Sequence, residues 1–429
     1  MMANKLNTVS QYPHIIPAPG DQADSIKKPF NNLTQAVFYF FLFSLPFEAA
    51  LVSAGFFGSD SSQSFWSLSR VTGLILIITF SLLQGVRAKW LPSVWGFAVY
   101  AILYVILAIG FLFAFNLPIS FAMFSLPWLI IHFVVCYEIF LDPVTRNRGV
   151  KVLMIAIGAC ALLQLSNHAF NSYDLMTYDS TYLRTAAFGN DPNLIGAQYL
   201  VGIFLAIFIS LDIIPGGKII KIIAVAVAGC CMIALVQSGS RGAVISGGFA
   251  FLPFLLTKKP IKKRLAIWIT VLFVVVMAII LLVNNEGFKQ RFINTFTYGD
   301  TAMRTEIYQT SYRLFLASPW VGYGPERNLF ALGSALGRTY TDTHNVLLWV
   351  LTANGLIGFI PFIFSLGACL YQAYRARNGP DDIAPLVLCT LVIAFSQTVT
   401  WQTEKLFWVL LAFAASATVF KVNQNNFRK

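Results

Sequence analysis

The residues most able to do chemistry stand where a long polar segment gives way to an apolar one, at His344 and Asn345. Nine residues separate Asn345 from Gly355, and Gly358 follows three residues later. On one helix the two glycines would lie within roughly 40° of His344, and small residues on that face would permit close packing. The pattern predicts a fixed catalytic or binding imidazole at a membrane surface. The alternative is a structural histidine at the level of the lipid headgroups.

A second candidate, Arg241, lies between two apolar stretches that almost no loop separates. Gly239 and Gly242 flank it, and Ser240 precedes it directly. A tight turn there would present backbone N–H groups and a guanidinium at the depth of lipid phosphates, which suits an anionic ligand. The alternative is an arginine that snorkels to the membrane surface.

Two more arginines are expected outside the membrane on the same side. Arg184 lies a few residues before Pro192, which fits the first turn of an apolar helix capped by Asp191. Arg304 lies on a helix predicted within a long polar loop. Each is a candidate contact for an anionic substrate. The alternatives are a plain surface arginine for Arg184 and a solvated helix face for Arg304.

Several kinds of site find no support in the sequence. The acidic residues on the outer side do not cluster with metal-ligand spacing, and neither do the His and Cys residues. The six cysteines lie in apolar stretches, so no structural disulfide is expected. The sequence lacks G-x-S-x-G, Walker A and H-E-x-x-H motifs. We therefore predict no metal ion and no cofactor, with arginine forks offsetting any phosphate charge.

The composition indicates what must position these residues. With 57% hydrophobic residues, 11% charged residues and a mean hydropathy of +0.70, the chain is typical of polytopic membrane proteins. Apolar runs of about 20 residues can cross a bilayer. The sequence predicts an all-α polytopic membrane protein of about twelve spans, at residues 33–52, 68–84, 91–112, 117–140, 150–167, 193–213, 217–237, 242–257, 265–284, 345–373, 383–400 and 404–421.

The distribution of basic residues predicts the orientation. With the N-terminus inside and twelve spans, 20 of the 30 Lys and Arg residues fall on the inner side. Inner loops of membrane proteins carry such an excess, so both termini are predicted to be cytoplasmic. The net charge of +12 then reflects topology and contact with anionic membrane lipids, and no nucleic-acid partner is expected.

The predicted organisation has five parts. They are a flexible cytoplasmic tail without a signal-peptide layout (1–32), nine spans (33–284), a periplasmic loop with helices (285–344), three further spans (345–421) and a cytoplasmic tail (422–429). Within the loop, residues 300–319 predict a helix that Asp300 can cap and a proline ends. Its apolar, aromatic side indicates a lid against the outer leaflet or over the spans.

Four segments together resemble the bacterial O-antigen ligases and, more widely, the O-antigen polymerase/ligase superfamily of membrane glycosyltransferases. They are H-N-x9-G-x-x-G from His344, S-x-S-R-G around Arg241, R-T-A-A-F-G-N-D-P-N from Arg184, and the Arg304 helix followed by S-P-W-V-G-Y-G. The resemblance covers the span layout and is strongest over 236–360. The R-x3-L element of the family is not matched, because the fourth residue is Phe188 after Arg184 and Ile245 after Arg241.

The resemblance implies a GT-C-like fold and a reaction in lipopolysaccharide biosynthesis. An O-antigen glycan on undecaprenyl pyrophosphate, the donor, would pass to a sugar hydroxyl of lipid A–core, the acceptor. The transfer would be metal-independent and inverting, at the periplasmic face of the bacterial inner membrane. Because both substrates are lipid-linked, a site at the outer membrane surface between apolar spans suits them.

Roles for the residues follow from that reaction. Arg241 and Arg184 would stabilise the charge that builds on the pyrophosphate as the glycosidic bond breaks. The imidazole of His344, a group with a reference pKa of about 6.5, would take the proton of the acceptor hydroxyl or hydrogen-bond a phosphate oxygen as imidazolium. The expected substrate-binding residues are Arg304, Ser240, Gly242 and Asn345.

Three other functions remain open at this stage. An O-antigen polymerase uses the same donor but a second lipid-linked glycan as acceptor. A protein O-oligosaccharyltransferase would move the glycan to periplasmic proteins. A lipid-linked glycan transporter would need ionisable residues in the middle of its spans, where His132 is the one plausible candidate. The polar residues gather instead at one surface, which favours an enzyme.

Overall fold

The computed structural model describes residues 31–48, 67–86, 90–115, 122–169, 176–179, 184–187, 191–257, 259–298, 303–325 and 327–426. Its α-helices are α2 (Asn32–Ser44), α4 (Leu68–Leu83), α5 (Pro92–Phe115), α6 (Ala122–Phe140), α7 (Pro143–Ala169), α8 (Pro192–Ser210), α9 (Lys218–Ser238), α10 (Arg241–Ala250), α11 (Ile261–Val283), α12 (Glu286–Tyr298), α13 (Arg304–Ala317), α14 (Arg327–Ala335), α15 (Val346–Ala376), α16 (Ala384–Phe395) and α17 (Lys405–Asn426). Two 3₁₀ helices, η1 (Leu45–Phe47) and η3 (Leu252–Leu256), and the strands β1 (Met176–Asp179) and β2 (Arg184–Ala187) complete the described elements.

Each of the twelve predicted apolar spans overlaps a described helix, although their ends differ in several cases. Among the residues that the structure describes, six helices are long and apolar enough to cross a membrane: Pro92–Phe115, Pro143–Ser166, Pro192–Ser210, Lys218–Ser238, Ile261–Val283 and Val346–Ala376. The other apolar helices are shorter: Asn32–Phe47, Leu68–Leu83, Ser125–Phe140, Arg241–Leu256, Ala384–Phe395 and Lys405–Ala417. The described residues therefore form a largely helical protein with six candidate membrane-spanning helices, and twelve complete crossings stay a prediction.

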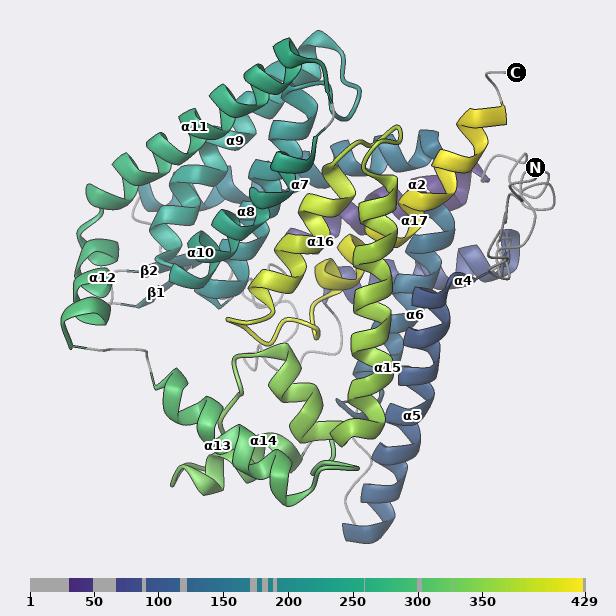
Figure 1. The fold of residues 1–429 in the computed structure, drawn as a ribbon, viewed down its shortest axis with the longest axis vertical. Helices are drawn as coiled ribbons and strands as arrows, with labels where there is room; N and C mark the ends of the chain where they lie inside the picture. Colours follow the sequence, from purple (N-terminus) through teal and green to yellow (C-terminus); the bar gives the residue numbers. More distant parts are fainter. Residues whose placement is uncertain are drawn as a thin grey trace, which may run out of the picture.

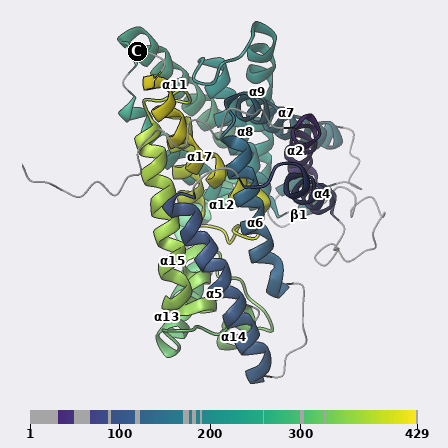
Figure 2. The same cartoon turned by 90° about the vertical axis from the view of Figure 1, so that its right-hand side faces the viewer.

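Two buried helices organise the bundle. In α8 every residue from Ile195 to Ile209 except Gln198 is buried, which fits a helix that is apolar on almost all sides. It packs against α7, α9 and α10, and α17 packs against α6, α15 and α16. The helices α5 and α15 lie side by side and extend beyond the rest of the bundle, to the end where α13 and α14 lie (Figures 1 and 2).

The two long polar connections differ in part from their predictions. The connection after α7 contains the antiparallel strands β1 and β2, in which Met176 pairs with Ala187 and Asp179 with Arg184. The helix predicted over 300–319 is observed as α13. Its N-cap position is Met303, with φ +60°, and the predicted cap Asp300 lies outside the described residues.

Helix α15 is broken, and the break corrects the prediction that His344, Gly355 and Gly358 share one helical face. Gly355 has φ +57° and ψ −161°, so residues 346–354 and 356–376 form two helices that meet at a sharp bend. His344 stands outside both, with φ +49°. Glycine adopts such a positive φ without the steric penalty that a Cβ would bring.

The lengths of α15 and α16 set the depth of the connection that follows α16. The two helices are joined at one end by residues 377–383, and α16 has 12 residues. At 1.5 Å per residue, α16 is about 18 Å long and residues 356–376 about 32 Å. The far end of α16 therefore stops about 14 Å short of Gly355. Figure 1 shows the connection between α16 and α17 at mid-height of α15.

Candidate active site

The predicted tight turn around Arg241 is confirmed. Helix α9 ends at Ser238, Gly239 caps it in the left-handed conformation with φ +62°, and α10 begins at Arg241. Ser240 is the N-cap of α10, where its Oγ accepts a hydrogen bond of 3.3 Å from the N–H of Ala243. The turn thus places a guanidinium at the first position of a helix, the end that attracts anions.

Helix α12 holds the Arg241 guanidinium in place. The Nη1 atom of Arg241 donates hydrogen bonds to the carbonyl of Arg291, at 3.1 Å, and to the hydroxyl of Thr295. In return, Arg291 Nη1 donates to the carbonyl of Gly239 at 2.6 Å. Nothing local in the sequence points to Arg291, because its partner is a backbone carbonyl some 50 residues away. The two arginines therefore join α12 to the turn and fix the plane of the Arg241 fork.

His344 is oriented by a neighbouring carboxylate. The Oδ2 atom of Asp342 accepts the backbone N–H of His344 at 3.3 Å and lies 3.5 Å from His344 Nδ1. Asn345 caps the next helix, where its Oδ1 accepts a 3.1 Å hydrogen bond from the N–H of Leu348. The His344 side chain is 37% exposed, so a substrate can reach it. Sequence reasoning missed the role of Asp342.

The S-P-W-V-G-Y-G segment packs against the break at Gly355. A Cβ on Gly355 would lie 2.3 Å from the carbonyl carbon of Trp320, so only glycine fits. Leu356 N–H donates to the Pro319 carbonyl at 2.8 Å and Ile357 N–H to the Trp320 carbonyl at 3.1 Å. Four residues earlier in the helix, the Thr352 and Ala353 carbonyls accept the N–H groups of residues 323 and 324, at 2.8 and 2.9 Å. The two motifs are thus joined by main-chain hydrogen bonds.

The connection between α16 and α17 brings the Arg241 turn and the His344 turn together. On one side, the Asn345 amide donates to Gln397 Oε1 at 3.3 Å, and the Val346 N–H donates to the Ser396 carbonyl at 2.8 Å. On the other side, a Cβ on Gly242 would lie 2.6 Å from Thr398 Oγ1. The elements that carry Arg241 and His344 therefore pack against adjacent residues of one short segment. We call residues 396–404 the floor segment.

Arg304 joins this group through Tyr308, one turn further along α13. The Tyr308 hydroxyl donates hydrogen bonds to the carbonyls of Gln397, at 2.8 Å, and His344, at 3.3 Å. Burial raises the pKa of the Tyr308 hydroxyl, and the positive charge of Arg304 acts in the opposite direction, which places Arg304 near it. Helix α13 is thus fastened over the His344 turn, where the predicted lid would be.

Ser240 also lies within the group, and Arg184 is placed only by its backbone. The Ser240 hydroxyl donates to Asn193 Oδ1 at 3.3 Å, which links the Arg241 turn to the start of α8. Arg184 begins β2, and β2 packs against α7, α8 and α9. A contact between Arg184 and a substrate stays a prediction. Among the described residues, no group of three His, Cys, Asp or Glu side chains is suited to hold a metal ion.

Comparison with known proteins bears on the same region. Residues 224–363, about a third of the chain, match the family model described as O-antigen ligase. The match contains Arg241, Arg304, His344 and Gly355, and it excludes Arg184 and the floor segment. No curated protein matches the chain. The family match supports the resemblance that the motifs indicate.

Proposed function

We propose that this chain, a member of the O-antigen ligase superfamily, transfers O-antigen polysaccharide from undecaprenyl pyrophosphate to a sugar hydroxyl of lipid A–core. The reaction would take place at the periplasmic face of the bacterial inner membrane, with both termini cytoplasmic. The observation that carries the proposal is the packing of the Arg241 and His344 turns against Gln397 and Thr398. The two residue types that the chemistry requires are about 100 residues apart in the sequence, and each lies on a turn that packs against this one segment.

Arg241 is assigned to the leaving group. As the bond from the anomeric carbon to the pyrophosphate breaks, its electron pair moves to the pyrophosphate oxygen, and the new charge needs fixed donors. A guanidinium fork matches phosphate oxygens in pairs, and the N-terminus of α10 adds backbone N–H groups and the positive end of its dipole. Arg184 and Arg304 would add further positive charge, so the transfer would proceed without a metal ion.

His344 is assigned to the proton of the acceptor or to a phosphate oxygen. In an inverting transfer, the acceptor oxygen attacks the anomeric carbon on the face opposite the pyrophosphate and loses its proton. The carboxylate of Asp342 fixes the His344 ring through Nδ1, which leaves Nε2 directed at the substrate. Asn345, Ser240 and Gly242 would bind and position the substrates beside the two turns.

The depth of the site fits two lipid-linked substrates. The floor segment follows α16, a helix about 18 Å long, and lies about 14 Å short of the bend at Gly355. It would therefore lie within the thickness of a bilayer whose core is about 30 Å. A pyrophosphate attached to an isoprenoid would reach this level without leaving the membrane. A site for a water-soluble donor has no reason to be recessed in this way.

The direct test mixes purified protein in detergent with undecaprenyl-pyrophosphate glycan and lipid A–core, in the presence of a chelator. We expect a lipid A–core product that carries the glycan. A strict requirement for Mg²⁺ would contradict the arginine-based mechanism. No product under either condition would contradict the ligase assignment.

A second measurement separates the ligase from a polymerase, which the superfamily also contains. Cells that lack a ligase accumulate polymer on the undecaprenyl carrier and make bare lipid A–core. Cells that lack a polymerase make core that bears single repeat units. Intact lipopolysaccharide with unglycosylated periplasmic proteins would instead indicate a protein O-oligosaccharyltransferase.

A further inference from the structure

The polar side chains of the floor segment differ in their surroundings. Ser396 and Gln402 are buried, at 1% and 0% exposure. Gln397, in contrast, is exposed, although it falls within the predicted span 383–400. An amide turned toward lipid would lose the hydrogen bonds that water gives it, which is costly. The exposed amide of Gln397 therefore indicates water or a polar ligand at this position.

The Gln397 amide keeps hydrogen-bonding capacity for a ligand. Its Nε2 donates to the Ile393 carbonyl at 3.3 Å, and its Oε1 accepts from the Asn345 amide at 3.3 Å. A carboxamide has two N–H donors and two lone pairs on its oxygen. Within the described part of the chain, one donor and one lone pair of Gln397 thus remain for a ligand. A sugar hydroxyl, which also donates and accepts, is matched to such a group.

Gln397 lies between the two turns of the candidate active site. Its amide is bonded to the His344 turn. The next residue, Thr398, packs against Gly242 in the Arg241 turn. The donor pyrophosphate is assigned to Arg241, and the acceptor hydroxyl would approach on the side of His344. The first sugar of the donor, which is bonded to the pyrophosphate and attacked by the acceptor, would therefore lie over Gln397.

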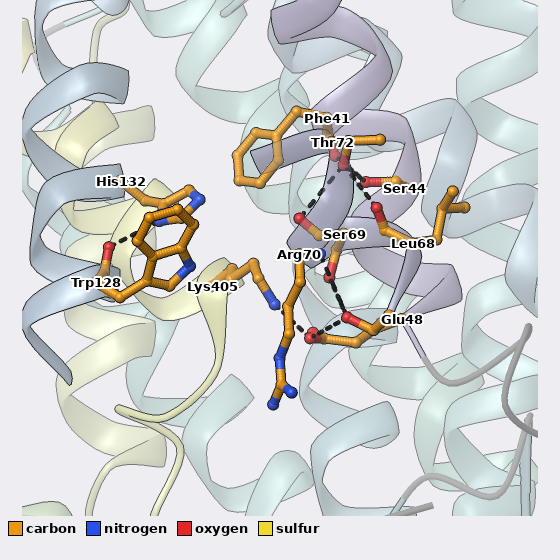
Figure 3. A network of polar contacts seen from close by, with 11 residues as sticks. Phe41, Ser44, Glu48, Leu68, Ser69, Arg70, Thr72, Trp128, His132 and Lys405 are labelled. Atoms are coloured by element: carbon orange, nitrogen blue, oxygen red, sulfur yellow. Dashed lines mark hydrogen bonds and ion pairs between the residues drawn. The ribbon is translucent and has the colours of Figure 1, made fainter. Parts of the chain in front are cut away.

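Contacts at both ends of the floor segment hold Gln397 in place. At the start, the Gln397 carbonyl accepts the Tyr308 hydroxyl at 2.8 Å. Trp401, in the middle, is 1% exposed and packs in the core. Just beyond the far end, the Lys405 ammonium pairs with the Glu48 carboxylate, and Figure 3 shows the Lys405 side chain extending to it. A hydrogen-bonding group fixed in this way needs little reorganisation when charge develops next to it.

We propose that Gln397 hydrogen-bonds the polar substituent, a hydroxyl or acetamido group, at C2 of the first donor sugar. C2 is the carbon next to the anomeric carbon, which gains positive charge as its bond to the pyrophosphate breaks. Hydrogen bonds at C2 strengthen in transition states of this kind, as in glycoside hydrolysis. Gln397 itself neither gains nor loses a proton in the transfer. The inference rests on the proposed transferase function and adds a selection for donors with a polar group at C2.

The test compares two undecaprenyl-pyrophosphate donors that differ only at C2, one with the polar group and one 2-deoxy. The ratio of their kcat/KM values should be about 10-fold larger for the wild type than for Gln397→Ala, because only the wild type can bond the C2 group. Any intrinsic change in the reactivity of the deoxy donor affects both proteins alike and cancels. Gln309→Ala, at an exposed amide on α13, should keep the wild-type ratio. Equal ratios for wild type and Gln397→Ala, as a merely structural role would give, would overturn the inference.

A labelling measurement tests the position of Gln397 without transfer. In right-side-out membrane vesicles, a membrane-impermeant maleimide should label Gln397→Cys, and undecaprenyl-pyrophosphate glycan should slow that labelling. Ile245→Cys, at an apolar side chain that is 58% exposed on α10, should stay unlabelled because it faces lipid. The wild type, whose six cysteines are buried or half-buried, is the blank.

Two results of this labelling would overturn the inference. They are a Gln397→Cys variant that the maleimide does not label, and labelling that the donor does not slow. Absence of transfer by the wild-type protein would overturn the proposed function, whereas equal donor ratios overturn only the role of Gln397.

Discussion

Gly242 lies directly against Thr398, so that a Cβ on the glycine would come within 2.6 Å of the threonine hydroxyl. This contact joins the helix that starts at Arg241 to the floor segment. In the same segment, Gln397, the residue before Thr398, accepts a hydrogen bond from the Asn345 amide. The two candidate catalytic residues are therefore kept at a fixed separation by close packing. A helix with a larger residue at position 242 would push them apart.

Gly242→Ala tests that close approach. The new methyl group must displace Thr398, and overpacking of this kind costs about 1–3 kcal/mol. We expect a lower melting temperature and a large loss of transfer. Gly248→Ala on the same helix is the control, because a Cβ there meets nothing within 4 Å. Equal effects of the two substitutions would show that the packing at Thr398 does not matter.

Replacement of the proposed catalytic residues should remove activity without removing the protein from the membrane. We expect His344→Ala and Arg241→Ala to abolish ligation, and Arg241→Lys to lose most of it, because an ammonium cannot bind two phosphate oxygens as a fork. The measurement is the amount of O-antigen on lipopolysaccharide in cells, with protein level checked in membranes. Lys289→Ala, at a side chain that is 50% exposed, should leave ligation intact. Near-normal O-antigen in either alanine variant would refute the site.

The break in α15 should tolerate no side chain. Gly355→Ala would force a Cβ to within 2.3 Å of the Trp320 backbone, in a conformation that already costs an L-residue about 1–3 kcal/mol. We expect a strong drop in thermal stability and rapid proteolysis of the segment between α13 and α14. Gly367→Ala, further along the same helix in open space, should behave as the wild type. Resistance of Gly355→Ala to protease would show that the segment is held by other contacts.

The carboxylate beside His344 should affect both rate and stability. Burial raises the pKa of Asp342, while the neighbouring His344 and several hydrogen bonds pull it down. The native state holds the Asp342 proton more tightly than the unfolded chain does. Protonation of Asp342 therefore stabilises the fold at low pH, and this stabilisation is lost as the pH rises through the folded-state pKa. Asp342→Asn removes that loss. Its melting temperature relative to the wild type should therefore rise with pH above about 4.

The same variant should also slow the transfer. An amide can still accept the backbone N–H of His344, but it places no charge beside the ring, so we expect kcat to fall with KM nearly unchanged. A melting-temperature difference that does not change with pH would mean that Asp342 is ionised in the native and unfolded states alike. An unchanged kcat would remove Asp342 from the mechanism.

The candidate site residues could be predicted from the sequence, whereas the contacts that hold them together could not. His344 and Arg241 stand out because polar residues at the ends of apolar runs are few. The bend at Gly355 was missed because a glycine that packs against a helix and one that breaks a helix look alike without their partner, here the Trp320 backbone. Gln397 and Thr398 carry no local signal, since their importance comes from contacts with residues far away in the sequence.

The attachment at Gly355 depends on main-chain atoms of the segment that starts at Pro319. Main-chain hydrogen bonds do not depend on side-chain identity. Most substitutions along this segment should therefore leave the attachment intact, apart from those at glycines. The attachment does depend on register. Insertion or deletion of a single residue within it would misalign its main-chain hydrogen bonds. The outer helices can therefore diverge widely in sequence, provided that the residue spacing within 319–324 and within 352–357 is kept.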